Sequence, residues 1–132
     1  KLFMSEFVLK EIEAIKGSKY DFYKLEINGV CSLDEFENEI SSNKQYYSEF
    51  MTLISYAQHY ADGIRIPDKK LNTIILNIKD VTSFEFKSKH LRIYFFHTNS
   101  NPDKIVALCG YKKKQKSDIN RLTIIVRRYL ND

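Results

Sequence analysis

Residues 84–113, FEFKSKHLRIYFFHTNSNPDKIVALCGYKK, contain three runs of aromatic and β-branched residues. The runs are Phe84–Lys87, Leu91–Thr98 and Lys104–Tyr111, and residues of these types favour a pleated, partly buried surface. His90 lies in a minimal turn between the first two runs, and residues 99–103 (NSNPD) supply turn chemistry before the third. The pattern predicts a three-stranded antiparallel meander.

Because side chains alternate across a sheet, each strand of the meander contributes to two faces. We expect one face to be apolar and to contain Phe84, Phe86, Leu91, Ile93, Phe95, Ile105, Ala107 and Cys109. The opposite face then receives Glu85, Lys87, Arg92, Tyr94, Phe96 and Lys112. Cations and aromatic rings on a common surface are typical of proteins that bind the phosphates and bases of nucleic acid.

Three helices are expected outside the meander. Ser32-Leu33-Asp34-Glu35 has the form of a capping box, with Cys31 placed as a hydrophobic staple, and predicts the start of a helix. Asn43 can cap a second helix, which Gly63 ends and in which apolar residues recur at helical spacing. A third, C-terminal helix is predicted with Ser117 as its N-cap.

The remaining segments complete the expected fold. Residues 20–27 predict a strand that joins the later sheet, and residues 64–80 predict a loop that leads into an edge strand. Residues 1–16 fit neither helix nor strand cleanly. We therefore expect an α+β fold, in which an antiparallel β-sheet has two helices packed on one face and a short C-terminal helix. A single domain should span residues 1–132.

Charge is distributed unevenly along the 132 residues. Residues 1–83 carry 10 Lys and Arg against 13 Asp and Glu, a net charge of −3, whereas residues 84–132 carry 11 against 4, a net charge of +7. Such asymmetry favours a polyanionic partner such as nucleic acid, or an acidic protein that covers the same surface. A solvated basic face that binds nothing is the alternative.

Composition is that of an ordinary globular protein, with 43% hydrophobic and 29% charged residues. No apolar run approaches the roughly 18 residues of a membrane span, and no secretory signal pattern is present, so we expect a cytoplasmic protein without a membrane partner. Cys31 and Cys109 fall in different predicted elements and lack metal-binding spacing. This predicts two reduced, structural cysteines.

The chain lacks the motifs of several enzyme classes. It has no metal-binding histidine pair, glycine-rich phosphate loop or Ser-His-Asp signal, so we expect no metal and no small-molecule cofactor. Glu85 is the only carboxylate in the meander apart from Asp103 of the loop, which argues against a metal-dependent nuclease. Lys, Arg, His and Tyr remain, and these residues can cleave RNA without metal. A base takes the proton of the ribose 2′-OH, and cations stabilise charge on the phosphate.

Three motifs occur in a characteristic order and spacing: Glu85-Phe86-Lys87, Arg92-Ile93-Tyr94-Phe95, and Tyr111-Lys112-Lys113-Lys114-Gln115-Lys116. In this respect the chain resembles the RelE/HigB-type toxins of bacterial type II toxin-antitoxin systems, particularly their phage-derived HigB-like branch. The resemblance covers about the last 50 residues. It implies a RelE-like fold and a metal-independent mRNA endoribonuclease, which acts at the ribosome and is neutralised by a cognate antitoxin protein.

The resemblance also implies roles for individual residues. Arg92 takes the phosphate-stabilising position, Lys87 replaces a basic residue that is often Arg, and Lys112 and Lys113 fill a basic pair before the last helix. The candidate catalytic residues are Arg92, Lys112, Lys113, Lys87 and His90. The candidate RNA-binding residues are Lys89, Tyr94, Tyr111, Lys114 and Lys116.

The identity of the general acid or base is left open, because RelE itself has a catalytic Tyr where this chain has Ile119. The candidates for the role are His90, His97, Lys89 and Tyr111.

Two other functions are compatible with the same residues. One is a ParE-like toxin that inhibits a protein such as gyrase, and the other is a nucleic-acid-binding module without activity.

Tyr94 and Tyr111 either anchor the antitoxin or complete the core. Arg92 and Lys113 should contribute little to the core, so we expect alanine at either position to abolish toxicity while the fold is retained.

Overall fold

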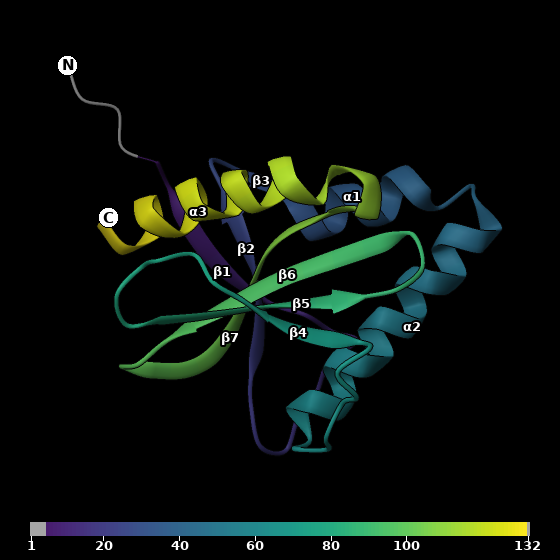
Figure 1. The fold of residues 1–132 in the computed structure, drawn as a ribbon, viewed down its shortest axis with the longest axis horizontal. Helices are drawn as coiled ribbons and strands as arrows, with labels where there is room; N and C mark the ends of the chain where they lie inside the picture. The colour runs from purple at the N-terminus through teal and green to yellow at the C-terminus, as the bar shows by residue number, and fades with distance from the viewer. Residues whose placement is uncertain (1–4, 132) are drawn as a thin grey trace.

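The computed structural model describes residues 5–131, and its central strands form the predicted meander (Figure 1). These strands are β5 (Val81–Lys87), β6 (Leu91–Thr98) and β7 (Asn101–Tyr111), and each pairs antiparallel with the next. The prediction of two consecutive hairpins is therefore confirmed.

The sheet is larger than predicted and contains seven strands within residues 5–131. The additional strands are β1 (Phe7–Glu11), β2 (Phe22–Ile27), β3 (Val30–Cys31) and β4 (Leu71–Ile74). The order is β1-β2-β7-β6-β5-β4, with β3 paired to β2. The strands expected in residues 20–27 and 64–80 are both present, the latter at an edge, and β1 forms in the segment that fits no clear pattern.

The α+β class is confirmed, but the expectation of a purely antiparallel sheet is wrong. β2 pairs parallel with β7, in a register that aligns Phe22 with Lys104 and Lys24 with Val106. Parallel neighbours require a long connection, and here two helices and four strands lie between the two partners. Neither strand's own sequence contains a sign of this pairing, because the partner is remote in the chain.

Helices cover both faces of the sheet (Figure 1). α1 (Ser32–Ile40) and α2 (Lys44–Ala61) pack Phe36 and Phe50 into a core with strand residues that include Phe86. α3 (Gln115–Asn131) packs Leu122 and Val126 into a second core on the other face. The C-terminal helix has 17 residues and forms a layer of its own, so the prediction of a short helix is wrong. No helix within residues 5–131 is both long and apolar enough to cross a membrane.

A β-bulge in β7 changes which residues face each core. Tyr94 pairs with Leu108, whereas the next residue, Phe95, pairs with Val106, so Ala107 is an extra residue in the strand. An extra residue shifts the alternation of side chains by one position. Ile105 and Ala107 consequently lie in the α3 core and not on the predicted apolar face.

Of the three N-cap residues predicted from the sequence, one is confirmed. The Asn43 side chain accepts a hydrogen bond from the Tyr46 amide at 3.0 Å, as predicted for an N-cap. The predicted capping box is absent, because Ser32 lies inside α1 and its hydroxyl accepts from the Cys109 amide of β7 at 3.0 Å. Ser117 is not an N-cap either, because α3 already begins at residue 115, after a 3₁₀ turn, η1 (Lys112–Lys114).

The start of α3 lies directly against β7 at Gly110. A Cβ atom at this position would overlap the carboxylate of Asp118, so only glycine permits so close an approach. Asp118 is 5% exposed, and burial raises the pKa of its carboxyl group. This contact places the basic turn η1 at the end of the sheet that carries the β5–β6 turn.

Candidate functional site

A hollow of about 290 Å³ lies at this end of the sheet, where three distant segments meet. Tyr46 comes from the first turn of α2, Lys89 and His90 come from the β5–β6 turn, and the remaining wall consists of residues 111–113. The amide of Lys112 donates to the carbonyl oxygen of His90 at 2.7 Å, which joins η1 to the β5–β6 turn. The hollow therefore combines aromatic rings, three lysines and a histidine.

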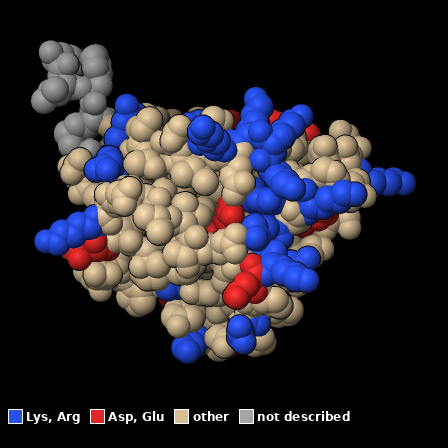
Figure 2. Space-filling view, viewed as in Figure 1, with Lys and Arg blue, Asp and Glu red and all other residues tan. Residues whose placement is uncertain are grey.

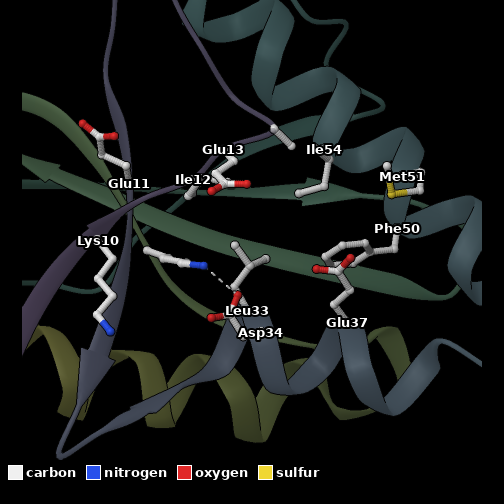
Figure 3. A pocket seen from close by; sticks show the side chains of 12 residues that line it. Lys10, Glu11, Ile12, Glu13, Leu33, Asp34, Glu37, Phe50, Met51 and Ile54 are labelled. Atoms are coloured by element: carbon white, nitrogen blue, oxygen red, sulfur yellow. Dashed lines mark hydrogen bonds and ion pairs between the residues drawn. The ribbon is translucent and has the colours of Figure 1, made fainter.

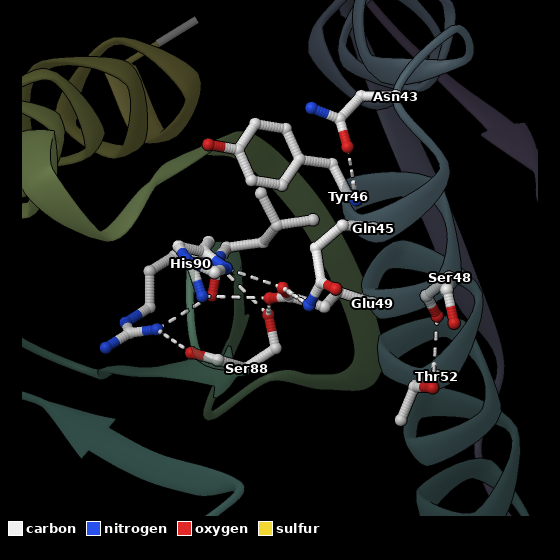
Figure 4. A network of polar contacts seen from close by, with 10 residues as sticks. Asn43, Gln45, Tyr46, Ser48, Glu49, Thr52, Ser88 and His90 are labelled. Atoms are coloured by element: carbon white, nitrogen blue, oxygen red, sulfur yellow. Dashed lines mark hydrogen bonds and ion pairs between the residues drawn. The ribbon is translucent and has the colours of Figure 1, made fainter.

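His90 is held by Glu49 of α2 (Figure 4). Its Nδ1 lies 2.6 Å from Glu49 Oε2, and its backbone amide donates to Glu49 Oε1 at 2.8 Å. Ser88 Oγ also donates to Glu49, and the Nε2 group of Gln45 donates to it at 2.9 Å. One carboxylate thus fixes both the ring and the backbone of the turn.

The hydrogen bonds of Glu49 determine its charge and the tautomer of the histidine. Burial raises the pKa of Glu49, but the hydrogen bonds from His90, Ser88 and Gln45 outweigh burial and lower the pKa to about 2. An ionised carboxylate can only accept, so His90 must donate through Nδ1. Its Nε2 is then free to accept a proton, and the His90 side chain is 37% exposed.

Replacing Glu49 with glutamine should lower stability in a pH-dependent manner. The pKa of Glu49 falls from 4.5 to about 2 on folding, so its contribution is complete above pH 4.5 and is lost as the pH falls toward 2. We expect Glu49→Gln to cost on the order of 2 kcal/mol at neutral pH, and this difference from the wild type should shrink in acid.

Urea unfolding at several pH values measures the effect. Glu35→Gln, which removes an exposed carboxylate from α1, is the matched control and should change little. A difference between wild type and Glu49→Gln that does not vary between pH 7 and pH 2.5 would contradict this account of the carboxylate.

Glu49 was not among the residues predicted from the sequence. It lies 41 residues before His90 and has the spacing of an ordinary polar residue of an amphipathic helix. No local motif could have identified it, because the pair forms only when α2 packs beside the β5–β6 turn.

Arg92 is buried, contrary to the expectation that it contributes little to the core. It is 6% exposed, and its Nη1 donates to the carbonyl oxygens of Ser88 and Leu91 at 2.7 and 2.8 Å. Its Nε lies 3.8 Å from Glu85, which also accepts a hydrogen bond from Gln115 at 2.7 Å. These contacts make Arg92 a support for the turn that carries His90.

The two tyrosines of the predicted RNA-binding set have different environments. Tyr94 is fully buried beneath α3, so it completes the core and does not present an exposed ring. Tyr111 is half-buried and lines the hollow, with its ring 5.6 Å from that of Tyr46. Its hydroxyl donates to Glu39 at 2.5 Å, and burial together with Glu39 raises its pKa to about 12.

The predicted basic residues form one surface around the hollow. Figure 2 shows Lys and Arg side chains gathered over the start of α3 and the β5–β6 turn. The exposed members are Lys89, Lys112, Lys113, Lys114 and Lys116, and we call them the basic surface. Lys87 is only partly exposed and lies opposite Arg92 in the sheet register.

His97, another candidate general base, lies at the other end of β6 from His90. Its Nδ1 is 3.1 Å from Nζ of Lys104, and burial and this lysine lower its pKa. His97 therefore does not join the hollow, whereas His90, Lys89 and Tyr111 all line it.

The chain matches no protein-family model, and no solved structure matches it. Among the described residues, no three His, Cys, Asp or Glu side chains form a group that could hold a metal ion. Cys31 and Cys109 are both buried and free, and burial raises the pKa of each thiol.

Proposed function

We propose that the protein is a RelE/HigB-like toxin that cleaves mRNA without a metal ion in the cytoplasm and is neutralised by a cognate antitoxin. The observation that carries the proposal is His90, which Glu49 holds from behind, in the wall of a hollow lined by lysines and aromatic rings. This combination supplies an oriented base, cations for a phosphate and a surface for a nucleobase.

In the proposed reaction, neutral His90 accepts the proton of a ribose 2′-OH at Nε2. The 2′-oxygen then attacks the adjacent phosphorus atom, and the bond from phosphorus to the 5′-oxygen breaks. The leaving oxygen takes a proton from an ammonium group of the hollow or from water. The products are a 2′,3′-cyclic phosphate and a 5′-hydroxyl end. Glu49 stabilises the imidazolium ion that forms and keeps Nε2 directed away from α2.

Other residues of the hollow serve binding. Lys112 and Lys113 are exposed and can stabilise the charge that gathers on the phosphate oxygens. The phenolic proton of Tyr111 is engaged with Glu39, so the ring suits stacking on a base better than proton transfer.

A single assay tests the proposal. The protein is incubated with end-labelled single-stranded RNA in EDTA, with and without translating ribosomes, and the product ends are analysed. We expect cleavage to leave 2′,3′-cyclic phosphate ends. We expect no cleavage after any nucleotide that carries a 2′-deoxyribose, because the attacking hydroxyl is missing there. Cleavage that requires added Mg²⁺, or that persists at deoxy positions, would contradict the mechanism.

A nucleic-acid-binding module without activity is the second candidate, and the burial of Arg92 favours it because this cation is not presented to a phosphate. If the protein binds RNA but cleaves it neither with nor without ribosomes, the result would support the binding-module function. Inhibition of gyrase supercoiling without RNA binding would instead support the ParE-like function.

The affinity for RNA should fall steeply with salt concentration. Lys112 and Lys113 should contribute a measurable part of this salt dependence. Each phosphate contact on a single strand contributes a slope of about −0.7 to the logarithm of affinity against the logarithm of salt concentration. We expect Lys112→Gln/Lys113→Gln to reduce this slope by about 1.4 in fluorescence anisotropy titrations.

The matched control is Lys69→Gln/Lys79→Gln, which removes two exposed lysines outside the hollow. Equal slopes for the two double variants would show that the basic pair does not contact the phosphates.

A further inference from the structure

A second hollow, of about 360 Å³, lies on the face of the sheet that α1 and α2 cover (Figure 3). One wall consists of residues 10–14, which end β1 and follow it, and the other walls come from the start of α1 and the middle of α2. It shares no residue with the hollow that contains His90. We call this second hollow the α1–α2 groove.

The floor of the α1–α2 groove is apolar. Ile12, Leu33, Phe50 and Ile54 reach it from three different segments, and each belongs to the buried core. Met51 stands at the rim and is 42% exposed. Exposed methionine is common on surfaces that adapt to a bound side chain, because its chain is flexible and polarizable.

The rim of the groove has an excess of negative charge. Its two lysines are already engaged, Lys24 with Asp34 at 2.9 Å and Lys10 with Glu26 at 2.8 Å. By contrast, Glu13 and Glu37 form no ion pair within the described part of the chain.

Figure 3 shows Glu13 and Glu37 on different walls of the groove, with apolar side chains between them. A ligand that fits must therefore combine an apolar centre with positive charge at its sides.

We propose that the α1–α2 groove docks a basic peptide segment of a partner protein. An apolar side chain of the segment packs on the exposed Met51, above the apolar floor of the groove, and flanking Lys or Arg residues pair with Glu13 and Glu37. Charge complementarity favours this occupant, because the groove presents carboxylates that the protein's own cations do not neutralise. The α1–α2 groove is separate from the hollow that the basic surface surrounds. The groove can therefore hold a protein while the other hollow holds RNA.

The probe is a fluorescein-labelled peptide in which one leucine is flanked on each side by two lysines, titrated with the full chain. We expect saturable binding, weakened at least about fivefold by Glu13→Gln/Glu37→Gln and also by a serine in place of the peptide's leucine. The matched control Glu6→Gln/Glu35→Gln removes two exposed carboxylates outside the groove and should change affinity by less than about twofold. Circular dichroism of each variant verifies that the fold is retained.

Amide chemical-shift mapping locates the bound peptide independently of the variants. Changes confined to residues 10–14, the start of α1 and the middle of α2 would support the proposal. Changes elsewhere, equal losses in the two double variants, or no binding would overturn it. Dimerisation that Glu13→Gln/Glu37→Gln abolishes would also overturn it, because the occupant would then be a second copy of this chain.

Discussion

Replacing His90 with glutamine is expected to lower the rate of RNA cleavage by at least about a hundredfold. Glutamine has a similar size but cannot accept the 2′-hydroxyl proton, and a positioned base contributes about 10² to 10⁴ to the rate. RNA affinity should change by less than about twofold, because the lysines of the basic surface remain. Single-turnover cleavage and anisotropy titrations measure the two quantities on the same preparation.

His59→Gln is the matched control, because His59 is an exposed histidine near the end of α2 and outside the hollow. It should cleave RNA at the wild-type rate. If His90→Gln retains full activity with an unchanged thermal unfolding curve, another group is the base, and Lys89 is the remaining candidate on the same turn.

Replacing Arg92 with alanine is expected to destabilise the fold by about 3 kcal/mol. Removing one partner of a buried ion pair leaves the other charge uncompensated, and here Glu85 is only 3% exposed. The carbonyl oxygen of Ser88 also loses the hydrogen bond from Arg92 Nη1, and that of Leu91 keeps only the hydrogen bond from the Ser88 amide. Loss of toxicity in this variant would then reflect loss of folded protein, contrary to the expectation that Arg92 can be removed without structural cost.

Urea unfolding separates a structural role of Arg92 from a catalytic one. Lys113→Ala, in the exposed η1 turn, should change the free energy of unfolding by less than about 0.5 kcal/mol. Glu85→Gln/Arg92→Met removes both charges at similar volume and should recover much of the stability that Arg92→Ala loses. An Arg92→Ala protein as stable as Lys113→Ala would show that the buried pair contributes nothing.

Part of the candidate site follows from local sequence. His90 was predicted in the turn before the second strand of the meander, and Lys112 and Lys113 were predicted directly after the third. Antiparallel pairing of consecutive strands brings these residues to one end of the sheet, as the pairing of Leu91 with Tyr111 shows. Glu49 could not be predicted, because its contact with His90 depends on how α2 crosses the sheet.

The sequence alone determined the meander, the three helices and the five exposed lysines of the basic surface. Strand alternation, helical spacing and turn residues act over a few neighbouring positions, so they can be recognised without knowing the fold. Only the tertiary structure decided the parallel pairing of β2 with β7, the burial of Arg92 and Tyr94, and the His90–Glu49 pair. Each of these depends on which remote segment covers a given face of the sheet. Local sequence patterns cannot reveal this, because they reflect only interactions between residues that are close in the chain.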